Sequence, residues 1–475
     1  MKYGLDFGTT NTSIAIKQNN IGKVLPLDNQ ASDPGVIRTM LYFLRRELTI
    51  SPLVPLKRLN SRTFTKDEIN YSGEQKFAIG QQAVEKYMTD NKFRHPGIIR
   101  KILTGKYVTI AAGADPVAEF YQDIDYGVGR FIQSMKTALK SASYTGTSIF
   151  GDFYTLEDLI STYVGKIKQL ADISQKEQLD EVVVGRPVHF SDNPQKDKAA
   201  QDRLELALKR IGFNKIKFVF EPVAAAEQFI STTGKENQLV FVFDFGGGTL
   251  DTAVVKTGKV SQSTNKVASE VLAADGVYIG GDLLNSDILQ KKLGPYFGSK
   301  AVFGDQQLDM PHYIYEALTA WYSIPSLNNP EMMNRFERLR YKNSDPAALD
   351  RLIYLIQSNL GFDLYEAIEI AKKQLSQHPS AIISFENGPI KIHQEITRTE
   401  FEEIITPRVE EIRETVLRTL KTAAVSSDQI DVVVRTGGSS LIPVFEKMLS
   451  DIFSKEKIKQ FETFTSIASG LALMD

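Results

Sequence analysis

Residues 241–255 are FVFDFGGGTLDTAVV, and residues 3–16 are YGLDFGTTNTSIAI. Each stretch is an apolar strand, a glycine-containing turn and a second apolar strand, a pattern that predicts a β-hairpin. Aligning Asp6 with Asp244 also aligns Gly8 with Gly246, at an offset of 238 residues in a chain of 475. A repeated unit separated by almost half of the chain predicts that the protein consists of two related halves.

The segments around the hairpins alternate between strand patterns and helix patterns. We predict strands at residues 181–185, 215–220 and 430–434, and helices at residues 195–210, from Pro222 onward and at 399–422. Alternation of this kind is typical of an α/β protein with mixed sheets. Residues 31–135 and 293–360 have weaker periodicity and more polar, proline-containing stretches. We interpret these two segments as insertions on the two core units.

The composition is that of an ordinary globular protein, with 42% apolar and 24% charged residues. At about 150 residues per domain, the length allows roughly three domain-sized units. The 56 basic and 58 acidic residues leave a formal net charge of −2. This balance provides no bulk electrostatic field for nucleic acid or for an anionic membrane, so we expect neither as a partner.

Residue counts exclude several kinds of site. The chain has no cysteine, which excludes disulfides, thiolate metal sites, iron–sulfur clusters and cysteine nucleophiles. It has five histidines and no HExxH array, so a histidine-built metal site is not expected. No apolar run approaches the roughly 18 residues of a membrane span, and the N-terminus has no signal-peptide pattern. We therefore expect a soluble, cytoplasmic protein.

Four glycine-rich turns stand out: Gly8-Thr9-Thr10, Gly246-Gly247-Gly248-Thr249, Gly280-Gly281 and Gly437-Gly438-Ser439-Ser440. Backbone N–H groups in such turns converge on an anion without obstruction from a Cβ atom, and threonine hydroxyls add donors. The aspartates before the first two turns lie within reach of a cation that accompanies a phosphate. A single turn of this kind is usually only a hairpin turn. Four turns, two of them duplicated with an aspartate, predict phosphate binding.

Other well-known phosphate motifs are missing from the sequence. Every Gly-Lys is followed by Val, Tyr, Ile or Glu, so there is no P-loop, and no GxGxxG occurs. Asp-Phe-Gly occurs twice, but the HRD string that a protein kinase needs does not occur. The P-loop, Rossmann and protein-kinase hypotheses are therefore rejected.

Six motifs in a fixed order establish a family resemblance. They are LDFGTTNTSIA, GRPVHF followed by FEPVAAAEQF, FDFGGGTLDTAVV, ADGVYIGGDLLN, YEAIEIAKKQLSQ and VVVRTGGSSLIP. With these motifs the sequence resembles the nucleotide-binding domain of the Hsp70 family, within the actin-like ATPase superfamily. The resemblance runs from residue 3 to about residue 472, although only the motifs are close. The Gly-Arg-Pro form at 185–187 is most similar to the short YegD-type branch.

The resemblance implies an α/β protein of the actin-like ATPase fold, with two duplicated RNase H-like lobes around a nucleotide cleft and helical or mixed insertions. The first lobe is expected at about 1–225, with its insertion at about 31–135. The second is expected at about 226–475, with its insertion at about 293–360. The last helix is expected to pack back toward the first lobe. Because the chain ends soon after the last motif, we expect no peptide-binding domain.

The resemblance also implies a role for each matching residue. Asp6 and Asp244 would hold Mg²⁺, mainly through water. The residues expected to contact the β- and γ-phosphates of ATP or ADP are Gly8, Thr9, Thr10, Asn11, Gly246, Gly247 and Gly248. Glu221, Thr249 and Asp251 match positions near the γ-phosphate and the attacking water. The residues expected near the ribose, the α-phosphate and the adenosine are Gly280, Gly281, Gly437, Gly438, Ser439, Glu369, Lys372, Lys373 and Ser376.

Two lysines compete for the position that orients the attacking water in the family. Lys101, in IIRKILTG, lies four residues before Gly105, as in the general family pattern. Lys136, in SMKTALK, precedes FYTLEDLISTYVGKIK, which is similar to the helix that follows the family's lysine. The distance from Lys136 to GRPVHF also fits better, so we prefer Lys136 and keep Lys101 as the alternative.

Some of these residues have simpler interpretations, and two positions depart from the family pattern. Glu221 is also a plain acid at a helix N-terminus, and Glu369 with Lys373 is also an ordinary surface pair of a helix. Leu441 stands where the family has an arginine that stacks on adenine, and Phe464 stands where it has an aspartate. At Leu441, apolar contact would replace a cation–π contribution of roughly 0.5–2 kcal/mol.

Three functions are compatible with the motifs. The first is an Hsp70-like, chaperone-related ATPase that slowly converts ATP and water to ADP and phosphate. The second is a nucleotide-dependent binding or scaffold protein without significant turnover, which the changes at Leu441 and Phe464 favour. The third is a small-molecule kinase of the same superfamily. GRPVHF and FEPVAAAEQF argue against a kinase because they match the chaperone branch and not a sugar-binding pocket.

An ATPase without its own peptide-binding domain needs another protein to sense lobe closure. ATP and ADP should differ in closure, since the γ-phosphate would bridge the two phosphate hairpins. We therefore expect a protein partner that prefers one nucleotide state. A candidate surface for this partner is the set Tyr313, Tyr315, Trp321 and Tyr322, with a buried core as the alternative interpretation.

Overall fold

The computed structural model describes most of the chain. The described residues are 1–19, 21–50, 63–65, 69–72, 74–91, 98–108, 117–125, 129–139, 141, 144–191, 193–233, 237–258, 269–319, 323–460 and 465–474. Of these, the side chains of residues 47–50, 63–65, 69–72, 91, 98–108, 117–125, 325 and 326 are not described. The Lys101 side chain, Trp321, Tyr322 and Phe464 therefore lie outside the described part of the structure.

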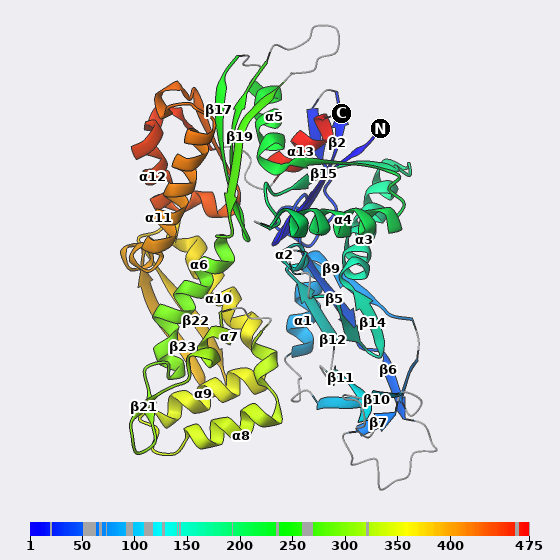
Figure 1. The fold of residues 1–475 in the computed structure, drawn as a ribbon, viewed down its shortest axis with the longest axis vertical. Helices are drawn as coiled ribbons and strands as arrows, with labels where there is room; N and C mark the ends of the chain where they lie inside the picture. Colours follow the sequence, from blue (N-terminus) through cyan, green and yellow to red (C-terminus); the bar gives the residue numbers. More distant parts are fainter. Residues whose placement is uncertain are drawn as a thin grey trace.

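Two mixed sheets with the same strand order form the centres of the two halves (Figure 1). The first has the order β16 (Lys215–Phe220), β15 (Glu181–Arg186), β1 (Tyr3–Phe7), β2 (Asn11–Gln18) and β3 (Ile21–Val24), with β4 (Ile37–Arg38) also paired to β2. The second has the order β25 (Ile458–Gln460), β24 (Val432–Thr436), β17 (Leu239–Phe245), β18 (Leu250–Lys256) and β19 (Glu270–Val277). In both sheets three parallel strands are followed by two antiparallel ones. The predicted α/β class with mixed sheets is confirmed.

The two hairpins quoted from the sequence occupy equivalent places in the two sheets. In the first, β1 pairs antiparallel with β2 and Asp6 lies opposite Ser13. In the second, β17 pairs with β18 and Asp244 lies opposite Asp251. Each hairpin turn follows the carboxyl end of a strand that has a parallel neighbour, β15 or β24. Both turns thus lie at the sheet edge where ligands bind in open α/β sheets.

Helices cover the sheets, and several of them begin where the sequence favours a cap (Figure 1). The principal ones are α3 (Leu156–Gln175) and α4 (Pro194–Arg210) on the first half, and α11 (Arg398–Thr422) and α12 (Pro443–Phe453) on the second. Thr155 and Asp158 form a capping box at the start of α3, and the Asn193 side chain accepts from two backbone N–H groups at the start of α4. The helices predicted at 195–210 and 399–422 are confirmed.

The segment between β4 and α3 builds the outer part of the first half. Its elements are β5 (Met40–Leu44), β6 (Glu47–Ile50), β7 (Thr63–Thr65), β8 (Ile69–Ser72), β9 (Phe77–Ile79), α1 (Gly80–Asn91), β10 (Ile98–Val108), β11 (Val117–Asp125), β12 (Gly129–Gln133), α2 (Met135–Ala138), β13 (Gly146–Ile149) and β14 (Asp152–Thr155). Strands β12, β5 and β9 form a sheet on which α1 packs. The short helix α2, which carries Lys136, follows β12 and contacts α3.

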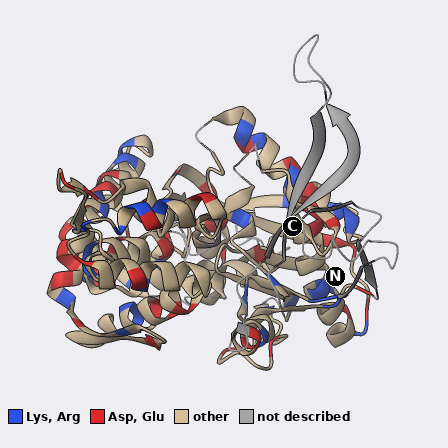
Figure 2. Ribbon diagram, turned by 90° about the horizontal axis from the view of Figure 1, so that it is seen from below, with Lys and Arg blue, Asp and Glu red and all other residues tan. Residues whose placement is uncertain are grey.

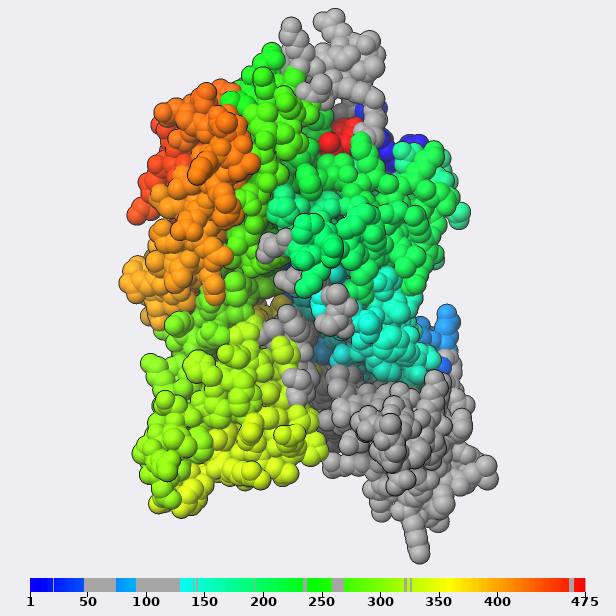
Figure 3. Space-filling view, in the orientation of Figure 1, coloured from blue at the N-terminus to red at the C-terminus, as the bar shows by residue number. Residues whose placement is uncertain are grey.

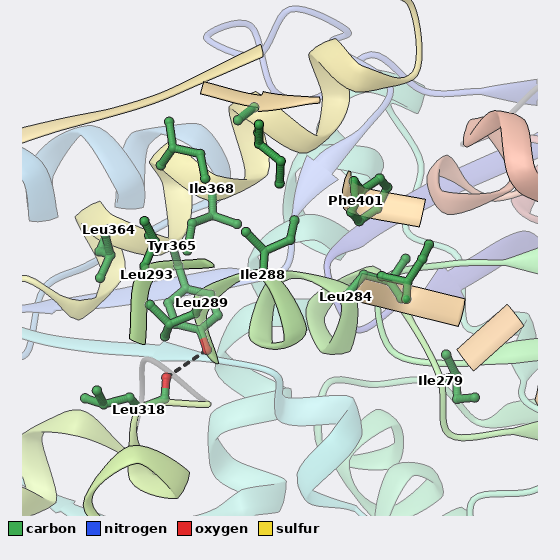
Figure 4. Packing of buried hydrophobic residues seen from close by; sticks show 14 of the residues in the cluster. Ile279, Leu284, Ile288, Leu289, Leu293, Leu318, Leu364, Tyr365, Ile368 and Phe401 are labelled. Atoms are coloured by element: carbon green, nitrogen blue, oxygen red, sulfur yellow. Dashed lines mark hydrogen bonds between the residues drawn. The ribbon is translucent and has the colours of Figure 1, made fainter. Parts of the chain in front are cut away.

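The corresponding part of the second half is mainly helical. Its elements are α6 (Gly281–Ile288), β20 (Val302–Phe303), β21 (Leu308–Asp309), α7 (His312–Ala317), α8 (Pro330–Leu339), α9 (Pro346–Gln357), α10 (Gly361–Leu375), β22 (Ser380–Asn387) and β23 (Ile390–Thr397). Figure 4 shows α6 and α10 packed through Ile288, Leu364 and Ile368, and the Tyr365 hydroxyl donates to the Leu318 carbonyl oxygen at 2.9 Å.

Two of the aromatic residues proposed as a partner surface, Tyr313 and Tyr315, lie on α7 and differ in burial. Tyr315 is buried, and its hydroxyl donates to the Phe297 carbonyl oxygen, whereas Tyr313 is 38% exposed. For Tyr315 the buried-core interpretation is therefore the right one. The other two residues of the set lie outside the described residues.

Two short helices lie between the two sheets and join them. These are α5 (Glu221–Thr233) and α13 (Ser466–Leu473), and Figure 1 shows them near the top of the molecule. A Cβ atom at Gly470 would overlap the Ala224 carbonyl oxygen of α5, and one at Gly4 of β1 would overlap the backbone of α13. Small residues thus let two helices and a strand pack with their backbones in contact. Together these helices bury a cluster with β15, β17, β18 and β24.

A second set of contacts joins the halves farther from these helices. Arg38 of β4 donates to both carboxylate oxygens of Glu366 on α10, at 3.1 and 2.5 Å. Phe362 at the start of α10 packs against Tyr87 of α1 and Phe131 of β12. In the space-filling view the halves form two columns, and the surface is hollowed between them (Figure 3). The halves therefore touch on both sides of the region that contains the hairpin turns.

Charged residues of both signs are interspersed along the described helices and strands (Figure 2). This distribution agrees with the near-zero net charge of the whole sequence. Among the described residues, no helix is long and apolar enough to cross a membrane.

The packing of α13 on α5 leads to a stability prediction. Gly470→Ala should lower the melting temperature, because its methyl group would be forced against the Ala224 carbonyl oxygen. Overpacking of this kind costs about 1–3 kcal/mol. Gly165→Ala is the matched control, since this glycine is also inside a helix but faces only the Ile211 side chain at 3.1 Å.

We expect Gly165→Ala to melt above Gly470→Ala, because its methyl group meets only the Ile211 side chain, which can shift, and alanine gains roughly 0.5–1 kcal/mol over glycine inside a helix. Differential scanning calorimetry on the two variants gives the measurement. Equal melting temperatures would contradict the close backbone contact between α13 and α5.

Candidate functional site

The first hairpin turn, Gly8–Thr10, is fixed from behind by Thr39. The Thr39 hydroxyl donates to the Gly8 carbonyl oxygen at 2.9 Å, and the Thr39 N–H donates to the Thr10 carbonyl oxygen at 2.8 Å. A Cβ atom on Gly8 would overlap the Asn11 carbonyl oxygen, so the turn requires glycine there. The turn is thus held rigidly, with Thr9 and Thr10 at its tip.

The second hairpin turn lies directly against the first. A Cβ atom on Gly247 would overlap the Thr10 hydroxyl, and one on Gly248 would lie within 2.6 Å of the Thr9 hydroxyl. Two turns that are 238 residues apart in the sequence therefore touch, one from each half. The Thr10 hydroxyl oxygen is buried and has no hydrogen-bond partner in the described part of the protein. A buried hydroxyl without a partner is expected where a polar ligand completes the site.

The third and fourth glycine turns close on the second. The Gly281 N–H and the Ser439 hydroxyl both donate to the Gly246 carbonyl oxygen, at 3.0 and 2.8 Å. The Asp282 N–H donates to the Gly247 carbonyl oxygen at 2.9 Å. Gly437 has a φ of +80°, and a Cβ atom there would overlap the Phe245 carbonyl oxygen. The structure thus brings all four predicted turns to one place.

One detail of the predicted phosphate cradle needs correction. The Gly246 N–H donates to the Thr249 carbonyl oxygen at 3.0 Å inside the turn. It is used by the hairpin itself, so it is not a free donor for a phosphate. The predicted amide donors are thereby reduced to those of Gly247 and Gly248.

Beside the turns, one lysine lies among several buried carboxylates. Lys136 Nζ is 2.5 Å from Glu221 Oε1, and both side chains are more than 90% buried. Asp6 and Asp244 project from the central strands of the two sheets, and Asp251 from β18. Gly185 makes room for this cluster, because a Cβ atom there would lie 3.0 Å from Glu221 Cγ.

Burial, together with neighbouring carboxylates, disfavours ionisation of the three aspartates in this cluster. Burial and the charge of Glu221 raise the pKa of Asp6 to about 7, although Lys136 acts in the opposite direction. Burial and Glu221 also raise the pKa of Asp251 to about 7. The pKa of Asp244 is raised well above its usual value by burial and by Glu221, Asp251 and Asp6. Lys136 does not fully compensate the buried carboxylates, and a cation placed here would be stabilised.

The cluster can be tested against the coordination that Mg²⁺ prefers. Within the described residues, no three carboxylate or histidine side chains converge to hold a metal ion directly. Mg²⁺ in phosphate sites usually keeps several waters and takes only one or two carboxylates. Asp6 and Asp244 fit that coordination, because each is a buried carboxyl whose pKa is raised and whose ionised form a cation would stabilise.

Predicted nucleoside-binding residues on α10 form a buried pair with α6. Lys372 Nζ lies 2.6 Å from Glu369 Oε2 and donates to the Gly281 carbonyl oxygen at 2.9 Å. The Asn285 side chain donates to Glu369 at 2.8 Å. Burial raises the pKa of Glu369, but the charges of Lys372 and Lys373, together with the hydrogen bonds to this carboxylate, outweigh burial and lower this pKa to about 2. Glu369 and Lys372 are thus fixed beside the third glycine turn.

The other nucleoside-side candidates are less constrained. The Lys373 side chain is exposed and only pairs with Glu369 at 3.4 Å, as the simpler interpretation expects for a surface pair. Ser376 is the residue that follows the last turn of α10. Leu441 ends the short helix after Gly438 and is partly buried.

Three contributors to the site were not singled out from the sequence. The Val188 N–H donates to Asp251 Oδ1 at 2.8 Å, Asn285 holds Glu369, and Arg38 bridges to the other half. A backbone donor such as that of Val188 has no residue-type signal. Asn285 could have been found, because it lies four residues after Gly281 on the same helix face.

The fold and site define an actin-like α/β protein with a duplicated glycine-containing hairpin. The family model described as Hsp70 protein matches residues 121–282 and 358–474, more than half of the chain. The chain therefore belongs to the Hsp70 family, a family of chaperone-related, ATP-binding proteins. Whether it falls in the YegD-type branch stays a prediction.

Curated relatives agree with this assignment. Two proteins named chaperone protein DnaK, from two strains of Thermus thermophilus, are each 25% identical over 391 residues. The match covers 78% of this chain and 53% of each relative. The chain thus spans about half of the length of these relatives.

The raised acid pKa values predict how stability depends on pH. A carboxyl whose pKa is higher in the folded protein stabilises the fold below its unfolded pKa, and this contribution is lost as pH rises through the folded value. For Asp6 the loss falls between about pH 4 and pH 7. Asp6→Asn should therefore stabilise the nucleotide-free, metal-free protein at pH 8 by about 1–2 kcal/mol, and by little at pH 4.

Glu157→Gln provides a control of opposite sign. Burial raises the pKa of Glu157, but the hydrogen bonds to its carboxylate, that from Arg203 foremost, and the charge of Arg203 together outweigh burial, and the pKa is lowered. Removal of the Glu157 charge should therefore destabilise the protein at pH 8. Chemical unfolding followed by circular dichroism at pH 4 and pH 8 measures both effects. An Asp6→Asn variant less stable than wild type at pH 8 would show that the carboxylates do not repel one another as described.

Proposed function

We propose that the protein binds Mg-ATP between its halves and hydrolyses it slowly to ADP and phosphate. The observation that carries this proposal is the contact of the Thr9–Thr10 turn with the Gly247–Gly248 turn, beside the Lys136 and carboxylate cluster. Membership of the Hsp70 family supports the same activity. Phosphoryl transfer to water requires positioning and charge neutralisation more than covalent help from the protein.

The glycine turns would bind the phosphates. We assign the hydroxyls of Thr9 and Thr10 and the amides of Gly247 and Gly248 as donors to the β- and γ-phosphate oxygens. The Thr10 hydroxyl supports this assignment because it is buried and has no hydrogen-bond partner among the described residues. Because donors come from both halves, a bound triphosphate would hold the halves together.

Asp6 and Asp244 would hold the magnesium ion through water. When bound, the ion supplies positive charge that neutralises the phosphates and the surrounding carboxylates. The two aspartates come from equivalent places in the two sheets, so each half contributes one of them.

The remaining groups of the cluster would orient the attacking water. Lys136 keeps its proton, because the charges of Glu221 and Asp6 raise its pKa although burial lowers it. Its ammonium can donate to a water oxygen and stays fixed by Glu221. Asp251, held by Val188 and by the Thr249 hydroxyl at 2.8 Å, offers an acceptor for the water proton.

The nucleoside would lie between α10 and the last two glycine turns. We assign Glu369 and Lys372 to the ribose hydroxyls, because they are polar, fixed and next to Gly281. Gly280, Gly437 and Ser439 would lie beside the α-phosphate and the ribose. Leu441 would give the adenine an apolar contact in place of a stacked arginine.

Replacement of Lys136 tests the proposed hydrolysis. Lys136→Met should reduce single-turnover ATP hydrolysis at least about a hundredfold, because the water loses its fixed ammonium donor. Binding of Mg-ATP, measured by isothermal titration calorimetry, should remain within a few-fold of wild type, since the phosphate donors are unchanged. Lys168→Met is the matched control. Lys168 is also buried and pairs with a carboxylate, Asp172 at 2.6 Å, but lies outside the cluster.

Each outcome has a distinct meaning. An absence of binding heat for wild type at millimolar Mg-ATP would reject the nucleotide-binding proposal. Binding without turnover by wild type would favour the nucleotide-dependent scaffold function. Equal hydrolysis by Lys136→Met and wild type would remove Lys136 from the site and leave Lys101 as the remaining lysine candidate.

We further propose that a protein partner distinguishes the ATP state from the ADP state. The γ-phosphate would bridge donors from the two halves, so its loss should loosen their contact and give two states of different closure. A partner can shift this balance only if it binds the two states with unequal affinity.

A pull-down from lysate with immobilised protein tests the partner proposal. The ATP arm uses Lys136→Met, so that ATP is not consumed, and the ADP arm uses the same variant. We expect at least one protein whose recovery differs between the arms. Identical recovery in both would contradict state-dependent partner binding, while leaving ATP binding itself intact.

A further inference from the structure

Arg186, in the Gly-Arg-Pro segment at the end of β15, makes more polar contacts than an ordinary ion pair needs. Its Nη2 donates to both carboxylate oxygens of Asp197 at 2.8 and 2.7 Å, and its Nη1 donates to the Gln201 side chain at 2.6 Å. Its Nε and Nη2 also donate to the carbonyl oxygens of Pro187 at 3.1 Å and Val188 at 3.4 Å. The side chain is only 12% exposed.

The same guanidinium is also enclosed by two aromatic rings. It lies over the ring of Phe190, 5.0 Å from the centroid, and over the ring of Phe220, 5.5 Å from the centroid. Asp197 closes the arrangement, since it also accepts from the Phe190 N–H at 2.6 Å. The segment 187–190 is therefore held at both of its ends and along its backbone.

This segment contacts the candidate site through its backbone. The Val188 N–H donates to Asp251 Oδ1 at 2.8 Å, and this buried hydrogen bond joins the first half to the second. Arg186 acts on the site through this segment. It holds the carbonyl groups on either side of the amide that fixes Asp251.

Arg186 also lies next to the residue that precedes Glu221. In the pairing of β15 with β16, Arg186 is opposite Phe220, and α5 begins with Glu221 immediately afterwards. The preceding residue of β15, Gly185, is the one over which the Glu221 side chain lies. Arg186 is thus next to Val188, which fixes Asp251, by way of the chain, and next to Phe220, which precedes Glu221, by way of the strand pairing.

We propose that Arg186 is a positioning residue for ATP hydrolysis. Through Pro187 and Val188 it sets the amide that orients Asp251, and through Phe220 it fixes the start of the helix that carries Glu221. This inference rests on the proposed function, because it assigns Asp251 and Glu221 to the attacking water. Small displacements of positioning groups are sufficient to slow such a reaction by about a hundredfold.

Arginine is required because of its planar fork of donors. One guanidinium reaches a carboxylate, an amide oxygen and two backbone carbonyls while stacking on rings. A lysine can retain the charge opposite Asp197, but its compact ammonium cannot hold the two carbonyls and stack between the rings. Arg186→Lys should therefore recover folding stability better than it recovers the rate of hydrolysis.

Arg203 of α4 supplies a matched control. Like Arg186, it pairs with one carboxylate, Glu157, and donates to two backbone carbonyls, those of Ser141 at 3.3 Å and Tyr144 at 3.1 Å. Its side chain is 19% exposed, close to the value for Arg186. Within the described residues, none of these Arg203 contacts joins it to a residue that touches Asp251 or Glu221.

The test compares wild type, Arg186→Lys, Arg186→Met and Arg203→Met. For each, the single-turnover rate of ATP hydrolysis, the Kd for Mg-ATP and the melting temperature are measured. Arg186→Met should lower the rate about 10- to 100-fold, with the Kd within about threefold because the phosphate donors are untouched. Arg203→Met should keep the wild-type rate even if it melts lower. Arg186→Lys should melt close to wild type and remain slow.

Hydrogen exchange of the nucleotide-free proteins gives a readout that does not depend on turnover. The Val188 amide hydrogen should exchange faster in Arg186→Met than in wild type. Its exchange rate should be unchanged in Arg203→Met. If Arg186→Met hydrolyses ATP at the wild-type rate, the proposed role of Arg186 is wrong. The same holds if both methionine variants show equal losses of hydrolysis rate, of Mg-ATP affinity and of melting temperature. Either result would leave the proposed ATPase activity itself intact. No hydrolysis by the wild-type protein would overturn the proposed ATPase activity and this inference with it.

Discussion

The packing of α5 and α13 between the two sheets is the constraint on which the site depends. Gly470 allows α13 to cross α5 with its backbone against Ala224, and Gly4 allows the same helix to lie on β1. Larger side chains would separate the sheets, and the two hairpin turns would no longer meet. The strand order of the two sheets is the same, but duplication alone does not place Asp6 and Asp244 together. The small residues of the joining helices do so.

Bringing the halves together has an electrostatic cost that the site itself reveals. Asp6, Asp244, Asp251 and Glu221 share a buried region with a single paired ammonium, that of Lys136. Burial and the charges of neighbouring carboxylates raise the pKa values of Asp6, Asp244 and Asp251, and a cation would relieve both effects. The apolar packing of the joining helices must therefore hold the carboxylates against their repulsion, which the proposed Mg-ATP would relieve. The same carboxylates thus lower the stability of the ligand-free protein and would favour binding of the proposed ligand.

The sequence predicted the parts of the protein that repeat or that have a local pattern. The duplicated hairpins, the strands at β15, β16 and β24, and the four glycine turns follow from spacing and residue type. The architecture within residues 31–135 and 293–360 did not, because its short strands and helices carry weak periodicity. Neither did the roles of Val188, Asn285 and Arg38, since a backbone donor or a contact across 328 residues leaves no local signal. The lobe boundaries and the residue roles in catalysis stay predictions.

Contacts between the halves link closure to the geometry of the carboxylates. The Val188 N–H belongs to the first half and Asp251 to the second, as do Thr10 and Gly247 across the paired turns. A rotation that separates the turns also pulls Asp251 away from the amide that orients it. The ion pair of Arg38 with Glu366 resists such a rotation from the other side of the turns. If α5 and α13 stay packed between the sheets, the halves would part at the turns, at the Arg38 contact and at the packing of Phe362 against Tyr87 and Phe131. Under the proposed function, a state open enough to release a nucleotide would therefore also be one in which Asp251 is no longer positioned for hydrolysis.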